Sequence, residues 1–106
     1  NMIEPEISKM LVLSTAHVDM PTRSLLDEWC RGIDLVTRQG ISVAPTLVGA
    51  HDYGWLVYCT ETCEGLPDDL TACIEYARGL GCCYLLLDAD ADEVDGLTVY
   101  ESETTE

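Results

Sequence analysis

Two segments of the chain place apolar residues at helical spacing, and short runs of strand-forming residues surround them. The first segment, residues 21–32, has Leu26 and Trp29 on one side and charged residues on the other, which predicts an amphipathic helix. The second, residues 67–79, opens with Pro67 and two aspartates and repeats its apolar residues at i, i+3, i+4 and i+7. Any fold for this chain must therefore cover the apolar sides of two helices.

The short apolar runs around these helices are typical of β-strands. We expect strands at residues 10–16, 41–48, 55–60, 83–87 and 97–100. The turn at residues 50–54 would join the second and third strands as a hairpin. Pro45 would place the second strand at an edge or at a bulge, because proline cannot donate to the ladder.

The resulting order, β-α-β-β-α-β-β, predicts an α/β protein, more specifically an α+β sandwich of the ferredoxin-like type. In this prediction a mostly antiparallel sheet has two helices on one face. The alternative is a three-layer α/β arrangement, but two helices of about a dozen residues hardly suffice to cover both faces of a five-stranded sheet.

The length of 106 residues suits a single domain, with an ordered core over about residues 8–101 and a polar tail at 102–106. The sequence shows neither a secretory signal nor an apolar stretch long enough to span a bilayer. We therefore expect a cytoplasmic protein. Six cysteines would suggest a disulfide framework in a secreted protein, but without a secretory signal we expect reduced thiols.

Charge is the second strong constraint on this chain. It has 20 acidic and 5 basic residues, for a formal net charge of −15. Affinity for nucleic acid or for an anionic membrane surface comes largely from cationic side chains, so we expect binding to neither. Four of the five basic residues precede residue 39, and one surface of the fold must be strongly negative. Such a surface attracts a basic protein partner, although solubility alone is an alternative explanation.

The densest acidic cluster follows the most apolar of the predicted strands. It lies within residues 88–95 and consists of Asp88, Asp90, Asp92, Glu93 and Asp95. As an interface, these carboxylates would contact the basic partner. As oxygen ligands, Asp88, Asp90 and Asp92 would bind a divalent cation, because clustered carboxylates attract hard cations. An EF-hand is excluded, since Glu93 stands where that calcium loop requires glycine.

The only two histidines, His17 and His51, each follow an alanine at a predicted strand end, with an aspartate nearby. If both strand ends lay on one rim of the sheet, the imidazoles and carboxylates would form a metal or acid–base site. A turn-capping role for each histidine is the alternative. Apart from such a divalent metal we expect no cofactor, and the sequence has no phosphate-binding glycine loop. Ser14 and Thr15 lie near His17, but no nucleophile elbow surrounds them.

Several phrases of the sequence resemble a known family. They are Leu11 to His17, Tyr53 to Val57, Ala77 to Cys82 running into Leu85 to Asp88, and Asp95 to Leu97 with Tyr100. Together they are similar to an uncharacterised bacterial family of small proteins, a domain of unknown function carried on plasmids and genomic islands. The resemblance covers about residues 8–101, with Thr98 where family members often have proline. It implies a mobile-element setting and no catalytic residue.

These observations favour a non-catalytic, acidic protein-binding module of a bacterial mobile element, which would mask a basic or nucleic-acid-binding partner. The alternative is a small metal-binding protein or metal-dependent hydrolase that uses His17, His51 and the carboxylates from Asp88 to Asp95. A homodimer formed through an exposed sheet edge is a third alternative.

Overall fold

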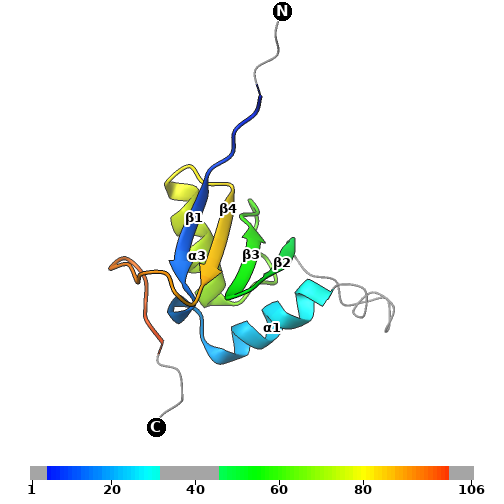
Figure 1. Ribbon diagram of the computed structural model, residues 1–106, viewed down its shortest axis with the longest axis vertical. Helices are drawn as coiled ribbons and strands as arrows, with labels where there is room; N and C mark the ends of the chain where they lie inside the picture. Colours follow the sequence, from blue (N-terminus) through cyan, green and yellow to red (C-terminus); the bar gives the residue numbers. More distant parts are fainter. Residues whose placement is uncertain (1–4, 32–45, 101–106) are drawn as a thin grey trace, which may run out of the picture.

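The computed structural model describes residues 5–31 and 46–100, which contain four strands and two α-helices (Figure 1). In chain order the elements are β1 (Met10–Ser14), the short 3-10 helix η1 (Thr15–His17), α1 (Met20–Arg31), β2 (Val48–His51), β3 (Gly54–Tyr58), α3 (Asp68–Gly79) and β4 (Tyr84–Asp88). Both predicted helices are confirmed, with boundaries that differ by one residue at most. Neither of them, nor any other helix in the described ranges, is long and apolar enough to cross a membrane.

The strands form one mixed sheet in the order β1-β4-β3-β2. The pairs β2–β3 and β3–β4 are antiparallel, whereas β1 and β4 are parallel. The parallel register joins Met10 to Tyr84 and Ser14 to Asp88, so β1 and β4 end side by side. The architecture is therefore the predicted α+β sandwich with a mostly antiparallel sheet, compatible with the ferredoxin-like type.

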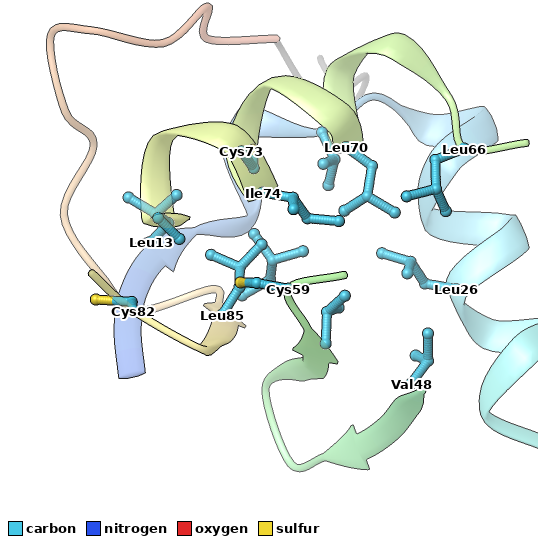
Figure 2. Packing of buried hydrophobic residues seen from close by; sticks show 14 residues of the cluster. Leu13, Leu26, Val48, Cys59, Leu66, Leu70, Cys73, Ile74, Cys82 and Leu85 are labelled. Atoms are coloured by element: carbon cyan, nitrogen blue, oxygen red, sulfur yellow. The ribbon is translucent and has the colours of Figure 1, made fainter. Parts of the chain in front are cut away.

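Both helices pack against the same face of the sheet. Because side chains alternate along a strand, Leu13 of β1 and Leu85 of β4 point to this face. They belong to one cluster with Leu26 from α1 and Leu70 and Ile74 from α3, which Figure 2 shows. All five side chains are fully buried. Since burial of one such side chain contributes about 1.5–3 kcal/mol, this layer holds the two helices on the sheet.

The connection from β3 to β4 passes to the opposite end of the sheet and then returns along α3. β3 ends at Tyr58, which lies beside the first residue of β4, Tyr84. Residues 59–67 lead to the opposite end of the sheet, where Asp69 in the first turn of α3 accepts a hydrogen bond from the main chain of Asp19. α3 then leads back to the start of β4. The N-termini of α1 and α3 consequently meet just beyond the end of β1.

The predicted hairpin is confirmed, but its strands are shifted along the chain. β2 extends to His51, so only Asp52 and Tyr53 form the turn, whereas residues 50–54 were expected there. The ladder sets this register, because Ala50 lies opposite Trp55 and His51 opposite Gly54. Residues 41–45 of the expected second strand, with Pro45, lie outside the described residues.

The fifth strand, predicted at residues 97–100, is not formed, and the sheet of the described residues has four strands. The hydrogen bonds of this segment go elsewhere. The N–H of Tyr100 donates to the carbonyl of Ala16 in η1, and the N–H of Leu97 donates to Val94 within a local turn. Leu97 also packs against the core. Of the alternating apolar residues, Leu97 therefore contacts the core, whereas Val99 is exposed, and neither pairs within the sheet.

The second face of the sheet is covered by neither α1 nor α3, and Figure 1 shows it in front, with α3 behind the strands. We call it the open face. Its apolar side chains alternate with those of the core and are Met10, Val12, Leu56, Tyr58, Tyr84 and Leu86.

Candidate functional site

The acidic loop, residues 88–95, leaves the sheet at the end of β4. Asp88 is partly buried, whereas the other four carboxylate side chains, those of Asp90, Asp92, Glu93 and Asp95, are exposed. Hydrogen bonds fix the first half of the loop. Oδ1 of Asp88 accepts the N–H of Asp90 at 2.8 Å, and the carbonyl of Asp88 accepts the N–H of Ala91 at 3.0 Å. The N–H of Ala89 donates to the carbonyl of Tyr53, which ties the loop to the β2–β3 turn.

His17 fixes the second half of the loop. Its side chain is buried, with 1% of its surface exposed. Nε2 accepts the N–H of Val94 at 3.0 Å, and Nδ1 lies 2.8 Å from the carbonyl oxygen of Thr98. Because a main-chain N–H can only donate, Nε2 is the acceptor and the ring proton on Nδ1 is donated to Thr98. Both ring nitrogens of His17 are thus used to hold the segment that follows the sheet.

His51 lies at the end of β2 and is exposed. Its Nε2 is 3.5 Å from Oδ2 of Asp88, and its ring meets that of Tyr53 edge-on, with 6.2 Å between centroids. His51 thus contacts a carboxylate of the acidic loop, whereas His17 contacts the main chain of the loop at Val94. The two carboxylate oxygens of Asp88 thus have different partners. Oδ1 accepts the N–H of Asp90 within the loop, and Oδ2 contacts His51.

A hollow of about 330 Å³ lies beside His51, between α1 and the β2–β3 turn. Several of the polar side chains that line it form hydrogen bonds with other groups of the protein. The indole N–H of Trp55 donates to Oδ1 of Asp27 at 2.9 Å, and the guanidinium of Arg23 donates to the carbonyls of Thr15 and Val18. The bond from Trp55 holds α1 against β3, and those from Arg23 hold α1 against η1 and the residue that follows it.

The structure does not bring His17 and His51 together. β1 and β2 form the two edges of the sheet, so their ends are separated by β4 and β3. Three strand spacings of about 4.8 Å make this roughly 14 Å. His17 also faces a different hollow, lined by Asp69 and Tyr100. In the part of the chain that the structure describes, no group of three or more His, Cys, Asp or Glu side chains is arranged to hold a metal ion.

In the part of the chain that the structure describes, Lys and Arg side chains do not neutralise the carboxylates by pairing with them. Among the described residues, Lys9 and Arg78 donate to main-chain carbonyls, of Leu80 and Cys59, just as Arg23 does. The one ion pair found in residues 5–31 and 46–100 is that of His51 with Asp88, and no Lys or Arg there pairs with a carboxylate. Within these ranges, the exposed carboxylates of the acidic loop therefore have no Lys or Arg partner.

Asp69 has a role that the sequence did not reveal. Its Oδ2 accepts the N–H of Asp19 at 2.8 Å, and its Oδ1 accepts the hydroxyl of Thr22 at 2.6 Å and the N–H of Leu70 at 2.8 Å. Paired aspartates at a helix start indicate only a favourable charge at the N-terminus. The link from α3 to α1 depends on how the two helices meet in space.

The cysteines offer no nucleophile at neutral pH in the core. All six are free. Burial raises the pKa of the Cys73 thiol to about 12 and that of the Cys59 thiol to about 11. Since the thiolate is the reactive form, these two residues act as small apolar side chains.

The model of a family of unknown function, described as the DUF5983 C-terminal domain, matches residues 10–102. No curated protein and no solved structure matches the chain significantly. The match begins at the first residue of β1 and extends beyond Tyr100, so it includes every strand and helix described above. The chain therefore belongs to the family of unknown function DUF5983, whose C-terminal domain it matches.

Proposed function

We propose that this chain is a non-catalytic protein-binding module, and that its acidic loop binds a basic protein partner. The observation that carries the proposal is that the carboxylates among the described residues lack Lys and Arg partners. The formal net charge is −15, and no Lys or Arg among residues 5–31 and 46–100 pairs with a carboxylate. A field of this sign attracts cationic surfaces and speeds their association.

The arrangement of the acidic loop supports this function. Asp90, Asp92, Glu93 and Asp95 are exposed, while the main chain that carries them is held by Asp88 at one end and by His17 at the other. A loop that is already ordered loses less conformational freedom on binding than a free one. The carboxylates are thus presented to a partner at low entropic cost.

We propose that the protein acts in the cytoplasm of a bacterium and that its gene is carried on a mobile genetic element. This part of the proposal is supported by the family resemblance of the sequence. We propose that the basic partner in that setting is a protein that itself binds nucleic acid. Docking of the acidic loop on the cationic surface of such a protein would mask its nucleic-acid site, since both compete for the same Lys and Arg side chains.

The test is affinity capture from a bacterial lysate by the immobilised chain, at low and at high salt. The loop variant carries Asp90→Asn, Asp92→Asn, Glu93→Gln and Asp95→Asn. The control variant carries Glu6→Gln, Glu61→Gln, Glu64→Gln and Glu75→Gln, which remove as much charge from exposed positions outside the loop. Circular dichroism checks that all three proteins are folded.

We expect the wild type and the control variant to retain the same basic protein at low salt, and the loop variant to lose it. High salt should release it, because the Debye length falls from about 10 Å at 0.1 M to about 3 Å at 1 M. Equal retention by the loop variant and the wild type would contradict the proposal. Equal loss by both variants would show that net charge alone is responsible and not the loop.

A further inference from the structure

We propose that the open face of the sheet is part of the same interface, and that the basic partner docks on it with an amphipathic segment whose apolar side covers the sheet. This inference rests on the proposed function and adds the chemistry of the partner. The partner would place apolar side chains over the strands and Lys or Arg side chains over the acidic loop.

The open face is apolar without being part of the core. Met10 is 48% exposed, Val12 44% and Tyr58 41%. They come from β1 and β3, on either side of β4, and the partly buried Leu86 of β4 lies between them as the register partner of Val12. Monomeric proteins rarely expose large contiguous apolar patches, and such patches often mark binding sites.

Charge is absent from the centre of this face. Charged residues make up 24% of the chain, yet no charged side chain lies between the six apolar side chains of the open face. Tyr58 and Tyr84 face each other across the strands, with ring centroids 5.6 Å apart and an angle of 70° between the rings. Aromatic side chains in a charge-depleted centre are characteristic of the central part of protein interfaces.

The open face and the acidic loop are continuous at Asp88. This residue is the last of β4, its side chain follows Tyr84 and Leu86 on the open face, and it is the first residue of the loop. A partner that spans this junction would therefore contact an apolar centre and an acidic rim at once. An amphipathic basic helix has both chemistries on one element.

The charge of the chain favours such a partner over a second copy. A second copy would bring another chain of formal net charge −15 against the first, whereas a basic segment would be attracted to it. Apolar contact alone would fit either occupant, so complementary charge is what distinguishes them. We accordingly expect the free chain to be a monomer.

The test uses two labelled 14-residue peptides of leucine and lysine with the same composition. In the first, the leucines lie along one side of a helix; in the second, the order is scrambled so that no apolar side forms. Binding to the full chain is measured by fluorescence anisotropy at low and at high salt. The face variant carries Met10→Thr, Val12→Thr and Tyr58→Thr. The matched control carries Met20→Thr, Leu80→Thr and Val99→Thr, at exposed apolar positions outside the open face.

We expect the amphipathic peptide to bind the wild type and the control about 10-fold more tightly than the scrambled peptide, and to keep part of its affinity at high salt. The face variant should lose this difference, while the loop variant described above should weaken the binding of both peptides. Light scattering should show a monomer.

Three results would overturn the inference. If the loop variant weakens both peptides but the face variant binds as the wild type does, the open face is not part of the interface, and the proposed function stands without it. If the free chain is a dimer that the face variant dissociates, a second copy occupies the face. If neither the loop nor the face variant changes binding, the proposed function fails as well.

Discussion

His17 accepts the main-chain N–H of Val94 through Nε2 at 3.0 Å, across 77 positions of the sequence. With its other ring nitrogen bonded to the carbonyl of Thr98, this buried imidazole joins the end of β1 to the segment that follows β4. A residue that the sequence suggested as a metal ligand thus holds the acidic loop in place.

Replacement of His17 by alanine should release the loop. It removes a buried side chain and leaves the N–H of Val94 and the carbonyl of Thr98 without their partner, so we expect a loss of about 2–4 kcal/mol in the free energy of unfolding. Urea denaturation measures the loss, and hydrogen exchange should become faster at Val94. His51→Ala is the control, because His51 is exposed and should cost less than about 0.5 kcal/mol. Unchanged exchange at Val94 would contradict this role of His17.

Gly54 should not tolerate a side chain. It lies at the start of β3 opposite Asp88, and a Cβ atom there would overlap the carbonyl oxygen of Leu87 in β4. Gly54→Ala should therefore disrupt the pairing of the two central strands and cost about 3 kcal/mol or more, in the range of severe overpacking.

Gly79→Ala is the matched control for this substitution. Nothing lies within 4 Å of a Cβ atom at Gly79, at the end of α3. Alanine is favoured over glycine in helices by about 1 kcal/mol, so this variant should be as stable as the wild type or more stable. Thermal denaturation of the two variants side by side tests both expectations. Equal melting temperatures would show that the close approach at Gly54 is relieved without cost.

The helices and the core were predictable from local patterns. Leu70, Cys73, Ile74 and Ala77 repeat at helical spacing, and all four are buried in α3. Such a pattern depends only on the local geometry of a helix. The positions of strands β1, β3 and β4 followed in the same way from short apolar runs, to within a few residues.

The order of the strands and the anchoring of the loop were not predictable. β1 pairs with β4, more than 70 residues later in the chain, and nothing local to either strand specifies that pairing. The charge of the acidic loop is visible in the sequence, but its fixation by His17 depends on the same long-range arrangement. Residues 97–100 resemble a strand in the sequence because they form a short apolar run, but in the structure Leu97 packs on the core without strand pairing. Their main-chain partners in η1 could not be inferred.

Asp69 should contribute far more to stability than its neighbour Asp68. Both carboxylates lie in the first turn of α3 and interact with its dipole. Asp69 in addition accepts hydrogen bonds from Asp19 and Thr22 at the start of α1. Asp69→Ala should cost about 2–4 kcal/mol, because the lost bonds involve a charged acceptor, whereas Asp68→Ala should cost about 0.5 kcal/mol.

Chemical denaturation of these two variants measures the difference. Thr22→Val is a further check, since it removes only the hydroxyl that donates to Asp69 at 2.6 Å. Its cost should be smaller than that of Asp69→Ala. If Asp68→Ala and Asp69→Ala destabilise the protein equally, the helix dipole explains both and the link between the helices contributes nothing.

Thiol reactivity should follow burial. Cys83 is exposed, whereas Cys59 and Cys73 are buried, and burial raises the pKa of their thiols to about 11 and about 12. At neutral pH iodoacetamide should alkylate Cys83 first and Cys59 and Cys73 last, because only the thiolate reacts. Mass spectrometry of partly alkylated protein gives the order. Early modification of Cys73 in folded protein would show that α3 opens away from the sheet.

The same thiols should make the reduced protein less stable at alkaline pH. Burial and, to a lesser extent, Asp69 raise the pKa of Cys73 from 9.0 in the unfolded chain to about 12 in the folded one. The folded state therefore holds its proton more tightly, so the stabilisation is complete below pH 9 and is lost as the pH rises towards 12. Between pH 9 and pH 11 the free energy of unfolding should fall by about 2–3 kcal/mol from Cys73 alone. Cys73→Ala should be less stable at pH 7 by about 1 kcal/mol, yet lose less on going to pH 11. Parallel stability curves for the two proteins over this range would show that Cys73 does not titrate in the unfolding reaction.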